Sequence, residues 1–99
     1  MNTFVESSEF SIWLSKLADQ KAKARILARL RSATLGNFGD SESVGEGVYE
    51  MRIHVGRGYR IYYMRTGSTL YVLLIGGWKA TQTKDIQKAK TMARELKGK

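Results

Sequence analysis

The sequence contains no cysteine and a single histidine, His54, among its 99 residues. Without cysteine there is neither a disulfide framework nor a thiolate nucleophile, and one histidine excludes the usual zinc sites. The longest apolar run, Leu70 to Ile75, is far shorter than the roughly 18 residues that a membrane span needs. The N-terminus also lacks the basic and then apolar order of a secretion signal. We therefore expect no membrane association, no metal cofactor and a cytoplasmic location.

Carboxylates are missing from a long internal stretch. Between Met51 and Lys84 there is no Asp or Glu, although six cations fall there: Arg52, Arg57, Arg60, Arg65, Lys79 and Lys84. Residues 1–50 hold six Lys or Arg and seven Asp or Glu, whereas residues 51–99 hold eleven and two, so the halves carry −1 and +9. This asymmetry favours a polyanionic partner, with nucleic acid first and an acidic protein or membrane surface second.

The first half of the chain has helical spacing. Phe10, Trp13, Leu14 and Leu17 form one apolar stripe, and a second apolar line runs from Ala22 to Ala33. Ser7 or Ser8 and then Asp19 are suited to cap these helices, and Gly36 is suited to end the second. The spacing predicts a short edge strand near Thr3 to Val5, followed by an αα-hairpin. We expect residues 36–47 to form a glycine-rich connecting loop.

The second half begins with strand spacing. From Val48 apolar and polar residues alternate, which predicts strands at 48–55 and 59–65 joined by a tight turn at 56–58. Residues 70–75 are apolar on both alternations, as in a central strand that Gly76 and Gly77 end. A helix then follows from about residue 82, with Thr81 or Thr83 as its cap. The predicted fold is one α+β domain over residues 1–99, ordered β-α-α-β-β-β-α, with a mainly antiparallel sheet.

The residues favour phosphate chemistry over other kinds of catalysis. The basic strands offer no acidic metal ligands, and no nucleophile elbow is present. Arginine and lysine around a phosphodiester stabilise the negative charge of an in-line transition state, while His54 or a tyrosine moves the proton. In RNA the 2′-hydroxyl is itself an available nucleophile.

Three motifs resemble the RelE/ParE toxin superfamily, and most closely its HigB-like addiction module killer branch. They are VGEGVYEMRI at 44–53, GYRIY at 58–62 and LLIGGWK at 73–79, followed by Gln82 and Asp85-Ile86. The resemblance covers almost the whole chain. It implies a RelE-like fold and a bacterial type II toxin that cleaves messenger RNA, often on the ribosome, with a helix-turn-helix antitoxin as partner.

The resemblance also assigns residues. Arg60 matches the active-centre arginine of RNA-cleaving members, Lys79 matches a basic position after the last strand, and His54 falls where a proton-transferring group stands. The predicted catalytic residues are thus Arg60, His54 and Lys79. The predicted RNA-binding residues are Arg52, Arg57, Tyr62 and Trp78. Arg57 and Trp78 depart from the branch, which commonly has proline and an acidic residue there; Trp78 and Tyr62 offer stacking surfaces for bases.

Other interpretations stay open at this point. A ParE-like toxin would bind and block DNA gyrase without cleaving anything, and a non-toxic basic binding module would retain the same fold. Arg60 could also serve only as an ion-pair partner of Glu50, and His54 as a solvent-facing side chain without a catalytic role.

Overall fold

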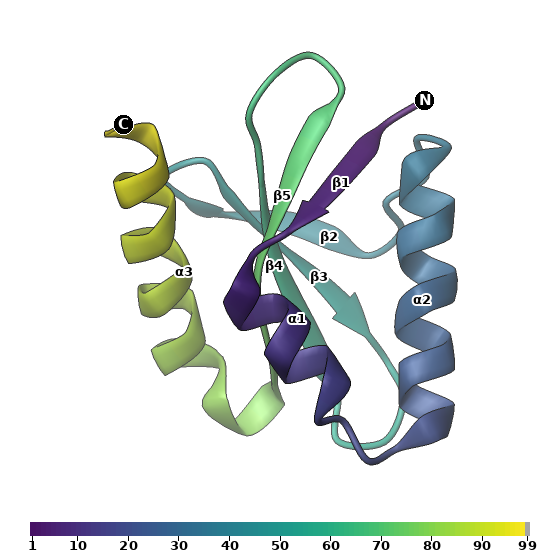
Figure 1. Cartoon of the computed structure of the whole chain (residues 1–99). Coiled ribbons are helices and arrows are strands. Elements are labelled where there is room, and N and C mark those ends of the chain that lie inside the picture. Colours follow the sequence, from purple (N-terminus) through teal and green to yellow (C-terminus); the bar gives the residue numbers. More distant parts are fainter. Residues whose placement is uncertain (99) are drawn as a thin grey trace.

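Five strands form one mixed sheet in the computed structural model, which describes residues 1–98 (Figure 1). In chain order the elements are β1 (Thr3–Glu6), α1 (Ser8–Ser15), α2 (Gln20–Thr34), β2 (Ser41–Gly45), β3 (Val48–Ile53), β4 (Tyr59–Arg65), β5 (Leu70–Trp78), the 3₁₀ turn η1 (Lys79–Thr81) and α3 (Gln82–Lys97). The strand order across the sheet is β1-β5-β4-β3-β2. β1 pairs in parallel with β5, and the other neighbours are antiparallel. The α+β class and the mainly antiparallel sheet are therefore confirmed.

The alternation of β3 and β4 sorts their side chains onto two faces. Met51 and Ile53 belong to a hydrophobic cluster on one face, whereas Val48 belongs to a cluster on the other. Arg52 lies directly opposite Arg60 in the antiparallel register, so the two arginines share a face. Glu50 stands opposite Tyr62 on this same face.

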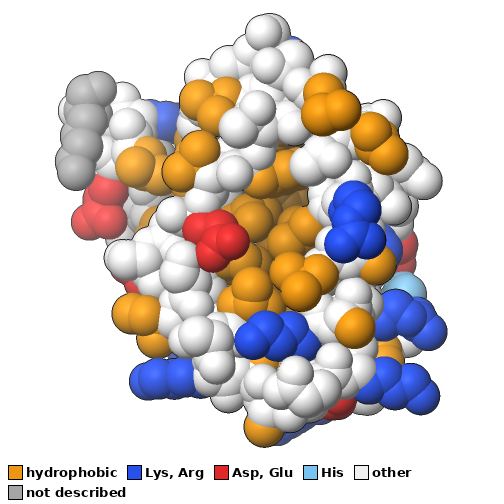
Figure 2. All heavy atoms as spheres, turned by 45° about the vertical axis from the view of Figure 1, so that its right-hand side comes forward, with side chains coloured by type: hydrophobic (Ala, Val, Ile, Leu, Met, Phe, Trp, Pro, Cys, Tyr) orange, Lys and Arg blue, Asp and Glu red, His pale blue; other side chains and the backbone are white. Residues whose placement is uncertain are grey.

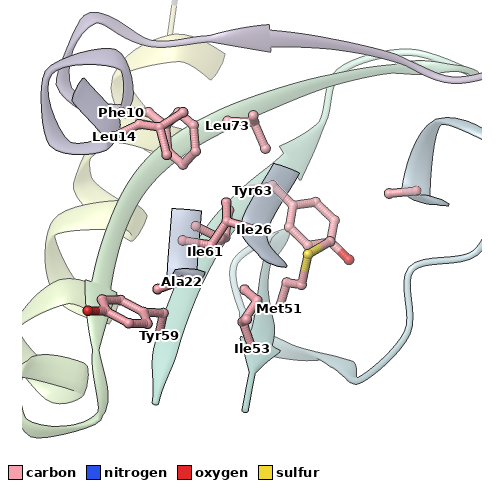
Figure 3. Close-up of a cluster of buried hydrophobic side chains, with 11 residues drawn as sticks. Phe10, Leu14, Ala22, Ile26, Met51, Ile53, Tyr59, Ile61, Tyr63 and Leu73 are labelled. Atoms are coloured by element: carbon pink, nitrogen blue, oxygen red, sulfur yellow. The ribbon is translucent and has the colours of Figure 1, made fainter. Parts of the chain in front are cut away.

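Each face of the sheet is covered by helices. Side chains of α1 and α2 pack on one face in a cluster around Phe10, Ile26 and Ile61, drawn in Figure 3. Side chains of α3, including Ala89 and Ala93, pack on the opposite face. Fully burying a side chain such as Phe or Ile contributes about 1.5–3 kcal/mol. The central strands are thus held from both sides, which explains why β5 is apolar on both alternations.

The glycine pair in β5 does not end the strand, contrary to the prediction, because β5 continues to Trp78. A Cβ atom at Gly76 would stand 2.2 Å from the ring of Trp13, and one at Gly77 would stand 1.9 Å from the Asp85 carboxylate. The glycines therefore let α1 and the start of α3 approach the strand closely.

The stretch at 36–47 is only partly a loop, and this corrects a second prediction. Residues 41–45 form β2, which pairs with β3 through a turn in which Glu46 has φ 53°. The Glu46 carboxylate accepts a hydrogen bond from Arg94 at 2.6 Å, and its carbonyl accepts one from Lys97 at 2.9 Å. A short polar edge strand has no apolar alternation, so its pairing depends on the backbone of β3 and on these contacts with α3.

The predicted helix caps are largely confirmed. The side chains of Ser7 and Asp19 accept hydrogen bonds from the first turns of α1 and α2, each at 3.0 Å, and Gly36 follows α2 with φ +96°. Thr81 precedes α3, but its hydroxyl donates to Asp85 instead of accepting from a helix N–H. The helices α1 and α2 follow one another with only residues 16–19 between them, and their side chains share one cluster on the sheet, where α1 contacts β5 and α2 contacts β3.

Candidate nucleic-acid interface

A pocket of about 400 Å³ opens beside the β3–β4 turn. We call it the cationic pocket; its lining residues are His54, Val55, Gly56, Arg57, Gly58, Arg60 and Lys79. It gathers four of the seven residues that the sequence predicts for the site, and no carboxylate belongs to its lining. The concentration of positive charge makes the pocket suited to an anion.

The turn itself brings Lys79 to the pocket. The amide of Lys79 donates a hydrogen bond to the Gly58 carbonyl at 2.9 Å, so the end of β5 is tied to the turn. Gly58 has φ +76°, a conformation that other residues rarely adopt. Within residues 1–98, neither Arg57 nor Lys79 forms an ion pair with a carboxylate, which leaves both charges available to a ligand.

Arg60 is a buried cation with unused hydrogen-bonding capacity. Its side chain is about nine-tenths buried, and its Nε has no hydrogen-bond partner among residues 1–98. The nearest carboxylate oxygen, Oε2 of Glu50, lies 4.0 Å away, which is within ion-pair range but too far for a hydrogen bond. A buried guanidinium with free donors is costly to maintain. Because Nε itself is inaccessible, only the part of the guanidinium that lines the pocket can meet an acceptor of a ligand.

Glu50 organises the floor beneath Arg60. This carboxylate is fully buried and accepts hydrogen bonds from Arg52 at 3.1 Å, Tyr62 at 2.9 Å and Gln82 at 2.8 Å. Three donors and the nearby Arg60 compensate its buried charge. Glu50 thus links β3, β4 and α3 directly under the cationic pocket.

Arg52 is not free to bind phosphate, which corrects its predicted role. Its guanidinium pairs with Asp40 at 3.2 Å, with Glu42 and with Glu50, and the hydrogen bond to Glu42 is the main reason that its pKa is raised. All of its nitrogen atoms have a carboxylate partner. Arg52 therefore acts as a structural bridge beside the pocket.

His54 is held by Asp40. The imidazole Nε2 lies 2.6 Å from Oδ2 of Asp40, while 68% of the His54 side chain stays exposed. The hydrogen bond from His54, followed by the charge and hydrogen bond of Arg52, lowers the pKa of Asp40 below its ordinary range. Because Asp40 occupies Nε2, Nδ1 remains the nitrogen available for proton transfer.

Tyr62 and Trp78, the two aromatic residues predicted to stack on bases, are engaged in contacts within the protein. Tyr62 is fully buried and donates its hydroxyl to Glu50, so it cannot contact a base. Burial, together with the hydrogen bond to Glu50, raises the pKa of Tyr62 far above its ordinary value. Trp78 packs against the core, and the Arg57 guanidinium lies over its ring at 3.5 Å from the centroid. The planar surface next to the pocket is therefore the guanidinium of Arg57.

Comparison with known sequences assigns the chain to a family. A family model described as phage derived protein Gp49-like (DUF891) matches residues 13–97. The chain belongs to the Gp49-like family. This family comprises RelE-like, toxin-type proteins, and the matched residues include the whole lining of the cationic pocket. An uncharacterized protein of Haemophilus influenzae is 51% identical to this Gp49-like chain over 87 residues, which is 88% of each chain.

The sequence analysis of this Gp49-like chain names Glu50 as a possible partner of Arg60 and Gln82 as part of a motif, but it does not predict their hydrogen bond, and it misses Asp40. Glu50 alternates with Arg52 on β3, a signal of a shared face, but its burial depends on α3. Asp40 lies fourteen positions before His54, and only the pairing of β2 with β3 brings them together. Among residues 1–98 no group of three or more His, Cys, Asp or Glu side chains is placed to hold a metal ion. Over the same residues no helix has the length and apolar content that a membrane span requires.

Proposed function

We propose that this chain is the toxin of a bacterial type II toxin–antitoxin system, of the HigB-like branch of RelE-like folds, and that it cleaves messenger RNA in the cytoplasm without a metal ion. The observation that carries the proposal is the cationic pocket, where His54, Arg60 and Lys79 come together without a carboxylate in the lining. The ribosome would present the messenger, and a helix-turn-helix antitoxin would be the partner. Membership of a toxin-type family supports the biological context.

The chemistry follows from the groups in the pocket. His54 accepts the proton of an RNA 2′-hydroxyl through Nδ1, and the oxygen attacks the adjacent phosphorus in line. The 2′-oxygen–phosphorus bond forms as the bond to the 5′-oxygen breaks, and water protonates the leaving oxygen. The products are a 2′,3′-cyclic phosphate and a 5′-hydroxyl end.

The cations act on the charge that develops during this step. Arg60 and Lys79 stabilise the additional negative charge on the phosphate oxygens, and Arg57 contacts the neighbouring backbone or stacks on a base. Glu50 and Asp40 position Arg60 and His54. Because Arg60 has free donors in a largely buried setting, its interaction with phosphate is stronger than that of an exposed arginine.

The decisive experiment combines induction in a bacterial host with mapping of RNA 5′ ends. We expect cleavage with wild type and a rate loss of about 10²-fold or more for Arg60→Ala and for His54→Ala in purified assays with EDTA. Arg31→Ala, an exposed change on α2, serves as the matched control and should cleave normally. Thermal unfolding of each variant shows whether the fold is intact.

The same assays identify failure. Undiminished cleavage in both Arg60→Ala and His54→Ala would place the active centre elsewhere. Growth inhibition with intact RNA and inhibited DNA gyrase would instead establish the ParE-like alternative. Comparison of naked with ribosome-bound messenger tests the requirement for the ribosome.

A further inference from the structure

A second pocket, of about 330 Å³, lies away from the cationic pocket. We call it the aromatic pocket; its lining residues are Phe38, Gly39, Ser41, Tyr49, Tyr63, Arg65 and Tyr71. Tyr63 belongs to the core cluster that α1 and α2 cover, whereas Arg60 and Tyr62 face α3. The two pockets share no lining residue, the cationic one lying at the β3–β4 turn, and nothing in the proposed RNA chemistry uses the aromatic one.

Its walls are rings that support one another. Phe38 stacks on Tyr63 with centroids 5.5 Å apart, and Tyr49 stacks on Tyr63 at 5.6 Å, so the three rings form one stack. Tyr71 closes against Phe38 at 5.2 Å. Tyr63 is almost fully buried, but 40% of Tyr49 remains exposed. The result is a rigid apolar surface with an open end.

The guanidinium groups of Arg29 and Arg65 lie near these rings, and neither is paired with a carboxylate among residues 1–98. Arg29 donates to the carbonyls of Phe38 and Arg52 and touches Gly39, and Arg65 donates to the carbonyls of its own hairpin. Backbone carbonyls fix the position of both charges but do not neutralise them. The rim of the aromatic pocket therefore attracts negative charge.

The geometry favours a protein ligand over a nucleotide. Each arginine already uses two of its nitrogen atoms on carbonyls, so neither presents the free fork that binds phosphate in a bidentate manner. The volume lies near the lower end of small-molecule pockets and suits one or two large side chains. Leu35, three residues before Phe38, is 71% exposed, which adds apolar surface at the same end of α2. Tyrosine and arginine around an apolar centre are typical of protein interfaces.

We propose that the aromatic pocket is the docking site of an acidic protein segment, whose large apolar side chain enters the pocket and packs against the rings while its carboxylates face Arg29 and Arg65. Figure 2 shows the side that α2 occupies: hydrophobic side chains gather in a hollow, with Lys and Arg side chains to the right of it and below it and an acidic side chain at its left margin. The antitoxin expected from the family resemblance would be one such partner. The proposal does not depend on RNA cleavage, because the aromatic pocket shares no lining residue with the cationic pocket.

A displayed library of random twelve-residue peptides tests this proposal with purified full-length chain. Peptides are selected for binding to the wild-type chain, and those that also bind the Arg65→Glu variant are removed. The remaining peptides should carry a large apolar residue close to Asp or Glu. A synthetic copy of an enriched peptide should bind wild type at least about tenfold more tightly than either Tyr49→Ala or Arg65→Glu. The matched charge control is Arg25→Glu. Arg25 is an exposed residue of α2 that lines neither pocket, so this substitution should alter the affinity less than about twofold.

Three results would overturn the proposal. The first is a selection that yields only peptides that bind all variants equally. The second is a set of enriched peptides without acidic residues. The third is Tyr49-dependent binding of a uridylate hexamer to the wild-type pocket while the peptides do not bind. Backbone amide shifts at Gly39 and Ser41 locate the bound probe in each case. RNA cleavage does not enter these measurements, so their outcome is independent of the proposed enzymatic activity.

Discussion

At the scale of single residues, the basic side chains of the site differ in how many carboxylates neutralise their charge. Arg52 is surrounded by three carboxylates, Arg60 has one distant carboxylate, and Lys79 has none within residues 1–98. The number of carboxylate partners therefore decreases from Arg52, in a structural ion-pair network, to Arg60 and Lys79, which line the cationic pocket. The residue identities alone do not distinguish these roles, because all three are basic side chains near the same two strands.

The Asp40–His54 pair gives a prediction about pH. Since contact with His54 lowers the pKa of Asp40 in the folded chain, the pair stabilises the fold above the ordinary carboxyl pKa of 3.8 and loses this effect as the pH falls through the lowered value. An NMR titration should place the Asp40 midpoint below 3.8 in wild type and closer to 3.8 in His54→Ala. Arg25→Ala should leave the midpoint unchanged; an identical midpoint in wild type and His54→Ala would contradict the contact.

Glu50 gives a prediction about stability. Glu50→Gln keeps the volume but removes the negative charge next to Arg52 and Arg60, so we expect a loss of about 3 kcal/mol in the free energy of unfolding. Glu42→Gln, at an exposed carboxylate of the same network, should cost less than about 1 kcal/mol. Urea unfolding followed by circular dichroism measures both. Equal losses in the two variants would show that the buried carboxylate has no special role.

At the scale of elements, the close approach of α1 and α3 to β5 depends on the two glycines of that strand. Their lack of a Cβ leaves space for Trp13 on one side and for Asp85 on the other. The end of β5 is thereby fixed, and with it Trp78 and Lys79 at the cationic pocket. A strand that carries such glycines is weaker by itself, and helix packing compensates for this.

Gly76→Ala tests this packing. The new methyl group would meet the rigid ring of Trp13 at 2.2 Å, so α1 has to shift, and we expect a loss of about 1–3 kcal/mol in the free energy of unfolding. Gly67→Ala is the matched control, because its nearest contact is the Leu70 Cβ at 3.8 Å. Thermal unfolding and Trp fluorescence should report the difference. A Gly76→Ala protein as stable as Gly67→Ala would refute the close-packing argument.

At the scale of the whole molecule, the net charge of +8 is distributed unevenly over the fold. Acidic residues of the first half, Asp40, Glu42 and Glu50, fold back onto Arg52 of the second half. They remove charge from that part of the surface. Three of the cations that these carboxylates do not pair with, Arg57, Arg60 and Lys79, line the cationic pocket.

RNA binding should therefore depend strongly on salt. If three cations of the cationic pocket each neutralise a phosphate, the logarithm of the binding constant should fall with the logarithm of salt concentration with a slope of about −2. Lys79→Ala and Arg57→Ala should each make the slope shallower by about 0.7. Filter binding of a short single-stranded RNA at several salt concentrations measures this. The control Arg52→Ala should change the slope little, since its charge is already paired.

The sequence by itself determined the faces of β3 and β4, the first two helix caps and the placement of His54 and Arg60 on either side of one short turn, because side-chain alternation and that turn act locally. Only the tertiary structure decided the rest. The pairing of β2 with β3 brought Asp40 to His54, and the packing of α3 buried Glu50 and Tyr62. Arg52 became a structural ion-pair partner for the same reason. These contacts join residues far apart in the chain, and local periodicity carries no information about which distant charges will meet.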